Sequence, residues 1–468
     1  MSFFKKYSTI LVLILSVICY FFFAYFLERT QFYMISFLWI ALFIGFYLLL
    51  KNKNSSFNTL IIVALLFRCI FIFATPNLSQ DFYRFIWDGR MLLNGFNPYL
   101  SLPESFMQLN LQPIAEASTL YDGMGKLNGS HYTNYPPLNQ LCFFIAALFA
   151  SKSIFGSIIV LRVLIIGADI GILYFGKKLL ERLNLPIRNI FWYLLNPFII
   201  IEMTGNLHFE PVMLFFLVWA LYKLHQQRWV YTAILIACSV SVKLIPLLFL
   251  PLFFQWFIYK DNKGMEKKSY EHQEKLLLSK YLVLKLAKLS LFYIIILTIT
   301  TLLFLPFYTP ELIGNYSSAV SLWFKDFEFN ASFYYLFREI GYLFSGYNEI
   351  AFIGRTTPIL TVLFLLYLTL FRRNKTFIQL ITAMLFGLCF YYFTATTVHP
   401  WYLATPLILC VFTNYKFPVI WSLVIILAYQ AYANNPWEEN LWFVFIEYLI
   451  VFSFFIYEIL NQLKMKKL

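Results

Sequence analysis

Long apolar runs separated by short polar connections fill most of this chain. The runs expected to form membrane-spanning helices lie at about 8–27, 31–50, 57–75, 154–176, 189–203, 210–224, 229–243, 245–260, 284–305, 348–371, 376–396, 401–415, 417–433 and 441–461. A helix needs roughly 20 apolar residues to cross the hydrocarbon core of a bilayer, and several of these runs have only about 15. The pattern predicts an all-α, polytopic transmembrane helical bundle of about 14 spans.

Two further apolar segments, 138–150 and 333–345, are only about 13 residues long, the length of a re-entrant or interfacial segment. Basic residues, which concentrate in cytoplasmic loops, decide how these segments are placed. Lys5 and Lys6 put the N-terminus inside. The basic groups after 154–176 and 348–371 are then also inside only if neither short segment crosses the membrane. We therefore expect both to lie at the external surface.

The same charge pattern divides the chain, expected to be a single integral-membrane domain over 1–468, between two sides. Residues 76–137 form a large first external loop, and 260–282 form a charged cytoplasmic connector. Lys464, Lys466 and Lys467 place the C-terminus inside, together with the N-terminus.

Composition agrees with a membrane protein and argues against a soluble one. The chain is 61% hydrophobic and 13% charged, whereas a soluble domain is about 45–50% apolar and about 25% charged. The net charge of +13 marks the cytoplasmic ends of spans and indicates no nucleic-acid partner.

Four charged residues, Asp81, Arg84, Asp88 and Arg90, stand close together just outside the third span. Asp81, Arg84 and Asp88 follow one another at i, i+3 and i+7, so they share one face of a helix, and apolar residues flank them. This pattern predicts an amphipathic helix that lies on the membrane, turns its charged face toward a cleft and ends at 94–98.

Further polar and aromatic residues fall at the same outer face, although they are far apart in the sequence. They are His131 and Tyr135 in the first external loop, His208 and Glu210 in the turn 205–211, Lys243 at the end of 229–243, and His399, Trp401 and Tyr402 after 376–396. An acid beside basic residues at a membrane surface suits one chemistry. The carboxylate takes a proton from an acceptor hydroxyl, while Arg or Lys holds a lipid phosphate.

Simpler interpretations of these residues stay open. The two acids also fit solvated loop charges, Lys243 fits a side chain that snorkels from a span end, and His399 fits an interfacial aromatic belt. His208 and Glu210 are a weak metal signal at i, i+2, so we favour hydrogen bonding to a sugar or acceptor over a divalent ion.

One pair of charges lies inside a predicted span. Arg162 and Asp169 are seven residues apart on one face of 154–176. Because charges in lipid are costly and usually partnered, we expect a structural polar link there and no catalytic role.

Five short motifs follow one another in a recognisable order. They are Asp81-Phe82-Tyr83-Arg84-Phe85-Ile86-Trp87-Asp88-Gly89-Arg90 with Gly95-Phe96-Asn97-Pro98-Tyr99, then Tyr135-Pro136-Pro137-Leu138, then Asn196-Pro197 with Glu202 and His208-Phe209-Glu210, then Lys243-Leu244-Ile245-Pro246, and last His399-Pro400-Trp401-Tyr402. Over 80–415 the chain resembles the polytopic glycosyltransferases of the GT-C class that use polyprenyl-phosphate sugars. In particular, it is similar to bacterial relatives of the polyprenyl-phosphate-mannose-dependent mannosyltransferases.

The resemblance implies an inverting hexosyltransferase of the bacterial inner membrane, with its site facing the periplasm or exterior and mannose as the expected sugar. A polyprenyl-phosphate sugar is the donor, a glycan, glycolipid or protein is the acceptor, and no cofactor is expected. Asp81 or Asp88 is the catalytic aspartate that acts as the base, because family members differ in its position. The expected donor-phosphate ligands are Arg84, Arg90, Lys243 and His399, and the expected sugar or acceptor contacts are His131, Tyr135, His208, Glu210, Trp401 and Tyr402.

Two other classes of membrane protein compete with this interpretation. A transporter or flippase of lipid-linked sugars places polar groups near the bilayer midplane and often contains inverted repeats. Here the polar residues gather at one face and no repeat is evident. A lipid-diphosphate-dependent ligase would use the same outward site, and competition between donors would separate the two.

Overall fold

The computed structural model describes residues 2–259, 271–325 and 327–465, and this part of the chain is helical. The first half contains α1 (Ser2–Tyr25), α2 (Phe32–Lys51), α3 (Phe57–Cys69), α4 (Asp81–Leu93), α5 (Pro103–Gln108), α6 (Ala117–Gly129), α7 (Pro137–Ala150), α8 (Ile154–Arg182), η1 (Ile187–Ile190), α9 (Phe191–Leu194), the π-helix η2 (Ile199–Gly205), α10 (Glu210–His225), α11 (Trp229–Val240), η3 (Ile245–Leu252) and α12 (Phe253–Tyr259). The second half contains α13 (Glu271–Phe304), η5 (Leu305–Phe307), α14 (Leu312–Lys325), α15 (Phe333–Ser345), α16 (Ile350–Leu370), α17 (Phe377–Thr394), η6 (Pro400–Leu403), α18 (Ala404–Val411), α19 (Phe417–Val424), η7 (Ile425–Ala433) and α20 (Leu441–Met465). The expected all-α class is confirmed, because the described residues hold no strand beyond one isolated bridge between Phe329 and Thr397.

The expected number of about 14 spans is not confirmed. Among the described residues, six helices are long and apolar enough to cross a membrane, or seven if η2 and α10, bent by 112°, count as one broken span. Other predicted spans are helical but shorter, because prolines and 3-10 turns interrupt them. Residues 245–259, for example, begin as a 3-10 helix that contains Pro246 and Pro251.

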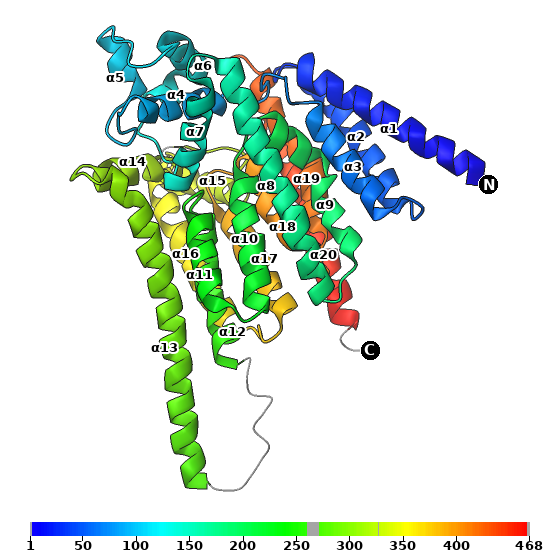
Figure 1. Cartoon of the computed structure of the whole chain (residues 1–468), viewed down its shortest axis with the longest axis vertical. Helices are drawn as coiled ribbons and strands as arrows, with labels where there is room; N and C mark the ends of the chain where they lie inside the picture. Colours follow the sequence, from blue (N-terminus) through cyan, green and yellow to red (C-terminus); the bar gives the residue numbers. More distant parts are fainter. Residues whose placement is uncertain (1, 260–270, 326, 466–468) are drawn as a thin grey trace.

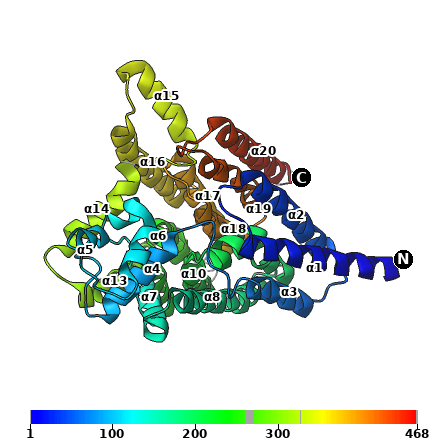
Figure 2. The same cartoon turned by 90° about the horizontal axis from the view of Figure 1, so that it is seen from above.

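The helices divide the molecule into two ends. α4, α5 and α6 gather at one end, and α12 and the start of α13 lie at the other (Figure 1). Seen from above, α4, α5 and α6 cluster on one side of the bundle, near α7 and α14 (Figure 2). The connector expected at 260–282 falls partly outside the described residues, and from Glu271 it is the beginning of α13.

The helix predicted around the charged motif is α4, and it ends where expected, with Asn94 as its C-cap and Gly95 at φ 80°. It does not lie on the surface, however. Nine of its 13 residues are buried, because α6 and α7 pack against it. Gly89 makes the contact with α7 close: a Cβ there would lie 2.2 Å from the carbonyl oxygen of Phe143.

Candidate active site

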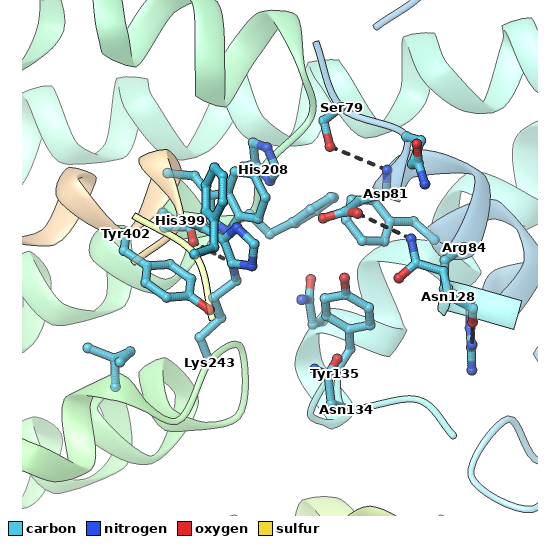
Figure 3. A pocket seen from close by; sticks show the side chains of 18 of the residues that line it. Ser79, Asp81, Arg84, Asn128, Asn134, Tyr135, His208, Lys243, His399 and Tyr402 are labelled. Atoms are coloured by element: carbon cyan, nitrogen blue, oxygen red, sulfur yellow. Dashed lines mark hydrogen bonds and ion pairs between the residues drawn. The ribbon is translucent and has the colours of Figure 1, made fainter. Parts of the chain in front are cut away.

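A cavity of about 450 Å³ opens between α4, the start of α7, the turn before α10 and the segment before η6. Ten of the twelve predicted site residues line it: Asp81, Arg84, His131, Tyr135, His208, Glu210, Lys243, His399, Trp401 and Tyr402. Figure 3 shows Asp81 and Arg84 on one side and His208, His399, Lys243 and Tyr402 on the other. The fold therefore brings together residues that are more than 300 positions apart in the sequence.

Asp81 is the first residue of α4 and lies half-buried on the cavity wall. Its backbone N–H donates to Ser79 Oγ at 3.3 Å, and Asn128 Nδ2 donates to its Oδ1 at 3.5 Å (Figure 3). Burial raises the pKa of the Asp81 carboxyl, and the opposing effects of Lys243 and Asn128 only reduce that rise. A carboxylate with a raised pKa is a stronger base than an exposed aspartate.

Arg84, one turn further along α4, is held by its own helix, by the end of α6 and by the loop that follows α6. Nε donates to Asp88 Oδ1 at 2.8 Å, and Nη1 donates to the carbonyl oxygens of Asn128 at 2.5 Å and His131 at 3.0 Å. Its Nη2 is buried and has no hydrogen-bond partner among the described residues. Arg84 lines the cavity, and its guanidinium keeps one nitrogen that no described residue accepts from.

Asp88 and Arg90 are the two predicted site residues that do not line the cavity. Asp88 is fully buried and accepts from Arg84 through Oδ1 and from Gln140 Nε2 through Oδ2, the latter at 2.9 Å. Both of its oxygens are thus committed inside the protein. Arg90 donates to the Ala115 carbonyl at 2.6 Å and to Glu116 at 3.0 Å, so its contacts do not support the expected role in binding phosphate.

Lys243 supplies the positive charge on the opposite wall. It follows α11 and forms an ion pair with Glu210, the first residue of α10. The carbonyl oxygen of Ser241 accepts from the backbone N–H groups of Leu138 at 2.9 Å and Asn139 at 3.4 Å. These bonds tie the Lys243 loop to the first turn of α7, immediately after Tyr135-Pro136.

Three rings form a stack beside Lys243. Trp401 lies between His208, with ring centroids 4.0 Å apart, and His399, at 4.4 Å. The segment around Phe329 fixes the backbone just before His399. The carbonyl oxygen of Phe329 accepts from the Val398 N–H at 2.8 Å, and the Phe329 N–H donates to the carbonyl oxygen of Thr396 at 3.1 Å. A flat face of aromatic rings suits the apolar face of a sugar, and it keeps the site dry.

Arg162 positions the turn that carries His208. The guanidinium donates to the carbonyls of Thr204 at 2.8 Å and Gly205 at 2.9 Å, which end the π-helix η2, and to those of Ile72 and Ala74. These carbonyls would otherwise lack partners at the helix ends. The structural role expected for Arg162 agrees with these bonds.

Asp169, its expected companion, pairs instead with Arg68 of α3 at 2.7 Å. Arg162 and Asp169 thus make two separate structural links, Arg162 to backbone carbonyls and Asp169 to Arg68. Neither residue lines the cavity.

Three polar residues stand out among the cavity residues that the sequence did not predict. Asn128 contacts Asp81, Asn139 is fully buried on the cavity wall, and Arg29 lies at the outer end of α1. Asn139 had a signal, because it is an amide inside an apolar run directly after Tyr135-Pro136-Pro137-Leu138. Arg29 also had one, because a basic residue on the expected outer side goes against the charge rule that orients the chain.

The described residues contain no group of three or more His, Cys, Asp or Glu side chains that could hold a metal ion. The cavity is lined by the half-buried Asp81, by Glu210, by the cationic side chains of Arg29, Arg84 and Lys243, and by stacked rings. Such a set is equipped to accept a proton, to hold an anion and to pack against a sugar.

The comparison with protein families decides the class of protein. The model of the MptA_B family, described as alpha-(1->6)-mannopyranosyltransferase, N-terminal domain, matches residues 18–259, just over half of the 468 residues. The chain belongs to this family. It is therefore a membrane glycosyltransferase, and the resemblance of the sequence motifs to mannosyltransferases is confirmed. No curated protein matches the chain.

The family match covers most of the cavity. Asp81, Arg84, Glu210 and Lys243 all fall within 18–259, whereas the stacked rings after α17 lie beyond it. Asp81, Arg84 and Lys243 thus all come from the part of the chain that matches this mannosyltransferase family.

Proposed function

We propose that the protein transfers mannose from a polyprenyl-phosphate donor to a hydroxyl acceptor at the outer face of the membrane. One observation carries this proposal: the half-buried Asp81 carboxylate shares a cavity with Lys243 and with the unpartnered Nη2 of Arg84. A base and two cations in one cavity match an acceptor hydroxyl and a leaving phosphate.

The reaction is a single displacement. Asp81 takes the proton of the acceptor hydroxyl, whose oxygen forms a bond with the anomeric carbon of the donor sugar. The bond between that carbon and the phosphate oxygen breaks on the opposite face, so the configuration inverts. Polyprenyl phosphate leaves with the bonding electron pair, and Lys243, Arg84 and the nearby His399 stabilise its charge.

The family description adds a linkage, α-(1→6). If this chain makes the same bond, the acceptor offers the primary hydroxyl at C6 of a hexose. Because a single displacement inverts the anomeric carbon, an α product requires a β-linked donor. The acceptor is then a glycan or a glycolipid that ends in a hexose.

The leaving group also bears on cofactors and on placement. A phosphate monoester carries less charge than a diphosphate, and the cavity supplies the cationic side chains of Arg29, Arg84 and Lys243, so we propose a reaction without a cofactor. We further propose a bacterial inner-membrane protein whose cavity faces the periplasm or exterior. The basic residues expected on the cytoplasmic side support this orientation.

The test uses membranes that contain the protein, supplied with polyprenyl-phosphate mannose and a hexose-terminated acceptor. We expect Asp81→Asn to lower kcat by about 10²- to 10⁴-fold, because it removes the base. Lys243→Ala should lower it by about 10²- to 10³-fold, because it removes a charge on the leaving phosphate. Asp122→Asn is the matched control, since Asp122 is exposed in the same loop and does not line the cavity.

Other outcomes would separate the rivals. Wild-type turnover by Asp81→Asn would refute Asp81 as the base. Preference for a lipid diphosphate in a donor competition would indicate a diphosphate-dependent ligase. Movement of the labelled lipid-linked sugar across the membrane without cleavage would indicate a flippase.

A further inference from the structure

Asn139 differs from the other buried Asn and Gln side chains of the described residues. Its side chain is fully buried and lines the cavity, yet neither Nδ2 nor Oδ1 has a hydrogen-bond partner among the described residues. Most buried polar groups in proteins are paired, and leaving one unpaired destabilises the fold. An amide that lines a cavity and has neither of its polar groups bonded within the protein is equipped to bind a polar ligand.

The position of Asn139 ties it to the phosphate end of the site. Its backbone N–H donates to Ser241, two residues before Lys243. Lys243 pairs with Glu210, whose Oε2 is also buried without a partner among the described residues. Two unpartnered acceptor atoms and one unpartnered donor group thus belong to cavity-lining residues that are bonded to Lys243 or to its loop.

We propose that the Asn139 amide and Glu210 Oε2 bind hydroxyl groups of the donor hexose and so determine which sugar is transferred. The chemistry fits, because each sugar hydroxyl both donates and accepts, while the amide offers an acceptor beside two N–H donors and the carboxylate only accepts. Neighbouring hydroxyls can bond to the two ends of one amide. This inference rests on the function proposed above.

The contacts favour the donor sugar over the acceptor. In a polyprenyl-phosphate sugar the hexose is joined directly to the phosphate, so it must lie next to the group that holds that phosphate. Lys243 is that group in the proposed reaction, and Asn139 is bonded to the loop of Lys243. The acceptor hydroxyl, by contrast, must approach Asp81 on α4, across the cavity from Lys243 (Figure 3).

Asn196 provides a matched control. It is also fully buried, but its Nδ2 donates to Ser422 Oγ at 2.9 Å and its Oδ1 accepts from the Phe198 N–H at 3.0 Å. It does not line the cavity. Asn196 therefore has the contacts of a structural amide, and Asn139 has those of a ligand-binding one.

The first measurement is thermal unfolding of the purified protein in detergent without substrate. We expect Asn139→Leu to leave Tm unchanged or to raise it, because the leucine removes an unpaired amide and keeps the volume. Asn196→Leu should lower Tm, because it leaves Ser422 and Phe198 without their partner. If Asn139→Leu lowers Tm as much as Asn196→Leu does, Asn139 is structural and the inference is wrong.

The second measurement is kcat/KM with polyprenyl-phosphate mannose and with its four monodeoxy analogues, which lack the hydroxyl at C2, C3, C4 or C6. We expect Asn139→Leu to lower kcat/KM for the natural donor by about 10- to 100-fold, as the loss of one or two hydrogen bonds predicts. With the analogue that lacks the bound hydroxyl, variant and wild type should differ by less than about 3-fold, within the usual context dependence of a single bond. Asn196→Leu should show the same selectivity among the donors as the wild type.

The outcomes distinguish the two proposals. If Asn139→Leu lowers kcat/KM by the same factor with every donor, the inference is wrong while the proposed transferase function stands. If the wild type transfers no sugar from any of these donors, the proposed function falls and the inference falls with it.

Discussion

The two acids of the charged motif, Asp81 and Asp88, have opposite surroundings. Asp88 is fully buried and both of its oxygens accept hydrogen bonds, from Arg84 and Gln140. Asp81 is half-buried on the cavity wall, with one long hydrogen bond from Asn128. A base must reach the acceptor hydroxyl, so these contacts favour Asp81 as the base and Asp88 as the residue that positions Arg84.

The raised pKa of Asp81 has a consequence for the pH dependence of the reaction. Burial is its main cause, and Asn128 opposes it. Because the base acts only when deprotonated, kcat/KM should fall as the pH drops through that pKa, at a higher pH than an ordinary aspartate would give. Asn128→Ala removes the hydrogen bond that favours the charged form, so it should move this acidic limb to still higher pH. A pH profile of kcat/KM measures both, and an unchanged limb in Asn128→Ala would contradict the assignment.

The packing of α4 against α7 fixes how two parts of the cavity lining lie relative to each other. Phe85 and Phe143 stack with ring centroids 4.7 Å apart, and Gly89 lets the two helices approach. A glycine in a helix normally destabilises it, so its presence here is explained by the close contact. The helix N-terminus with Asp81 and the first turn of α7 with Asn139 are placed by the same interface.

Gly89→Ala should therefore be disruptive although alanine favours helices. The added Cβ would lie 2.2 Å from the Phe143 carbonyl oxygen, so the helices must separate, at a cost of about 1–3 kcal/mol. The melting temperature Tm and the transferase activity, measured on the same preparation, should both decrease. Gly167→Ala in α8 is the matched control, because its Cβ would meet nothing within 4 Å, and it should be neutral or stabilising by up to about 1 kcal/mol. Equal behaviour of the two variants would contradict the close packing.

The bundle as a whole places the helix that carries Asp81 and the helices next to the expected cytoplasmic connector at opposite ends. α4, α5 and α6 lie at one end, and α12 and the start of α13 at the other (Figure 1). This separation agrees with the expected division of the chain by its basic residues. The number of membrane crossings is the quantity to measure, since six or seven helices among the described residues meet the length and composition of a span.

Parity distinguishes the two counts. An even number of crossings, such as six or 14, puts both ends of the chain on the same side of the membrane, whereas seven would put them on opposite sides. We expect reporters fused to either end to be active only as cytoplasmic fusions, because Lys5, Lys6 and Lys464 are basic. A second reporter, which is active only outside the cytoplasm, tests whether either end of the chain lies on the outer side. Activity of that reporter at one end alone would rule out the even count.

Much of the site was predictable because its residues break the apolar pattern. A charge or histidine beside a long hydrophobic run is costly in lipid, so Asp81, Arg84, His208, Lys243 and His399 stand out without any structure. Ten of the twelve predicted residues line one cavity for this reason. Asn128 and Asn139 were missed because an amide carries no charge, and its importance depends on whether neighbours satisfy it.

The helical class, the membrane location and the polar face follow from composition and from the spacing of apolar residues, because these depend only on the chemistry of each side chain in lipid or water. The partner of each polar group does not follow from them. Asp88 and Arg90 are as charged as Asp81 and Arg84, yet their hydrogen bonds are formed inside the protein. Only the packing of α4 against its neighbours determines which charges are neutralised there and which groups stay open to a substrate, because hydrogen bonds act over about 3 Å and sequence spacing does not specify such contacts between distant segments.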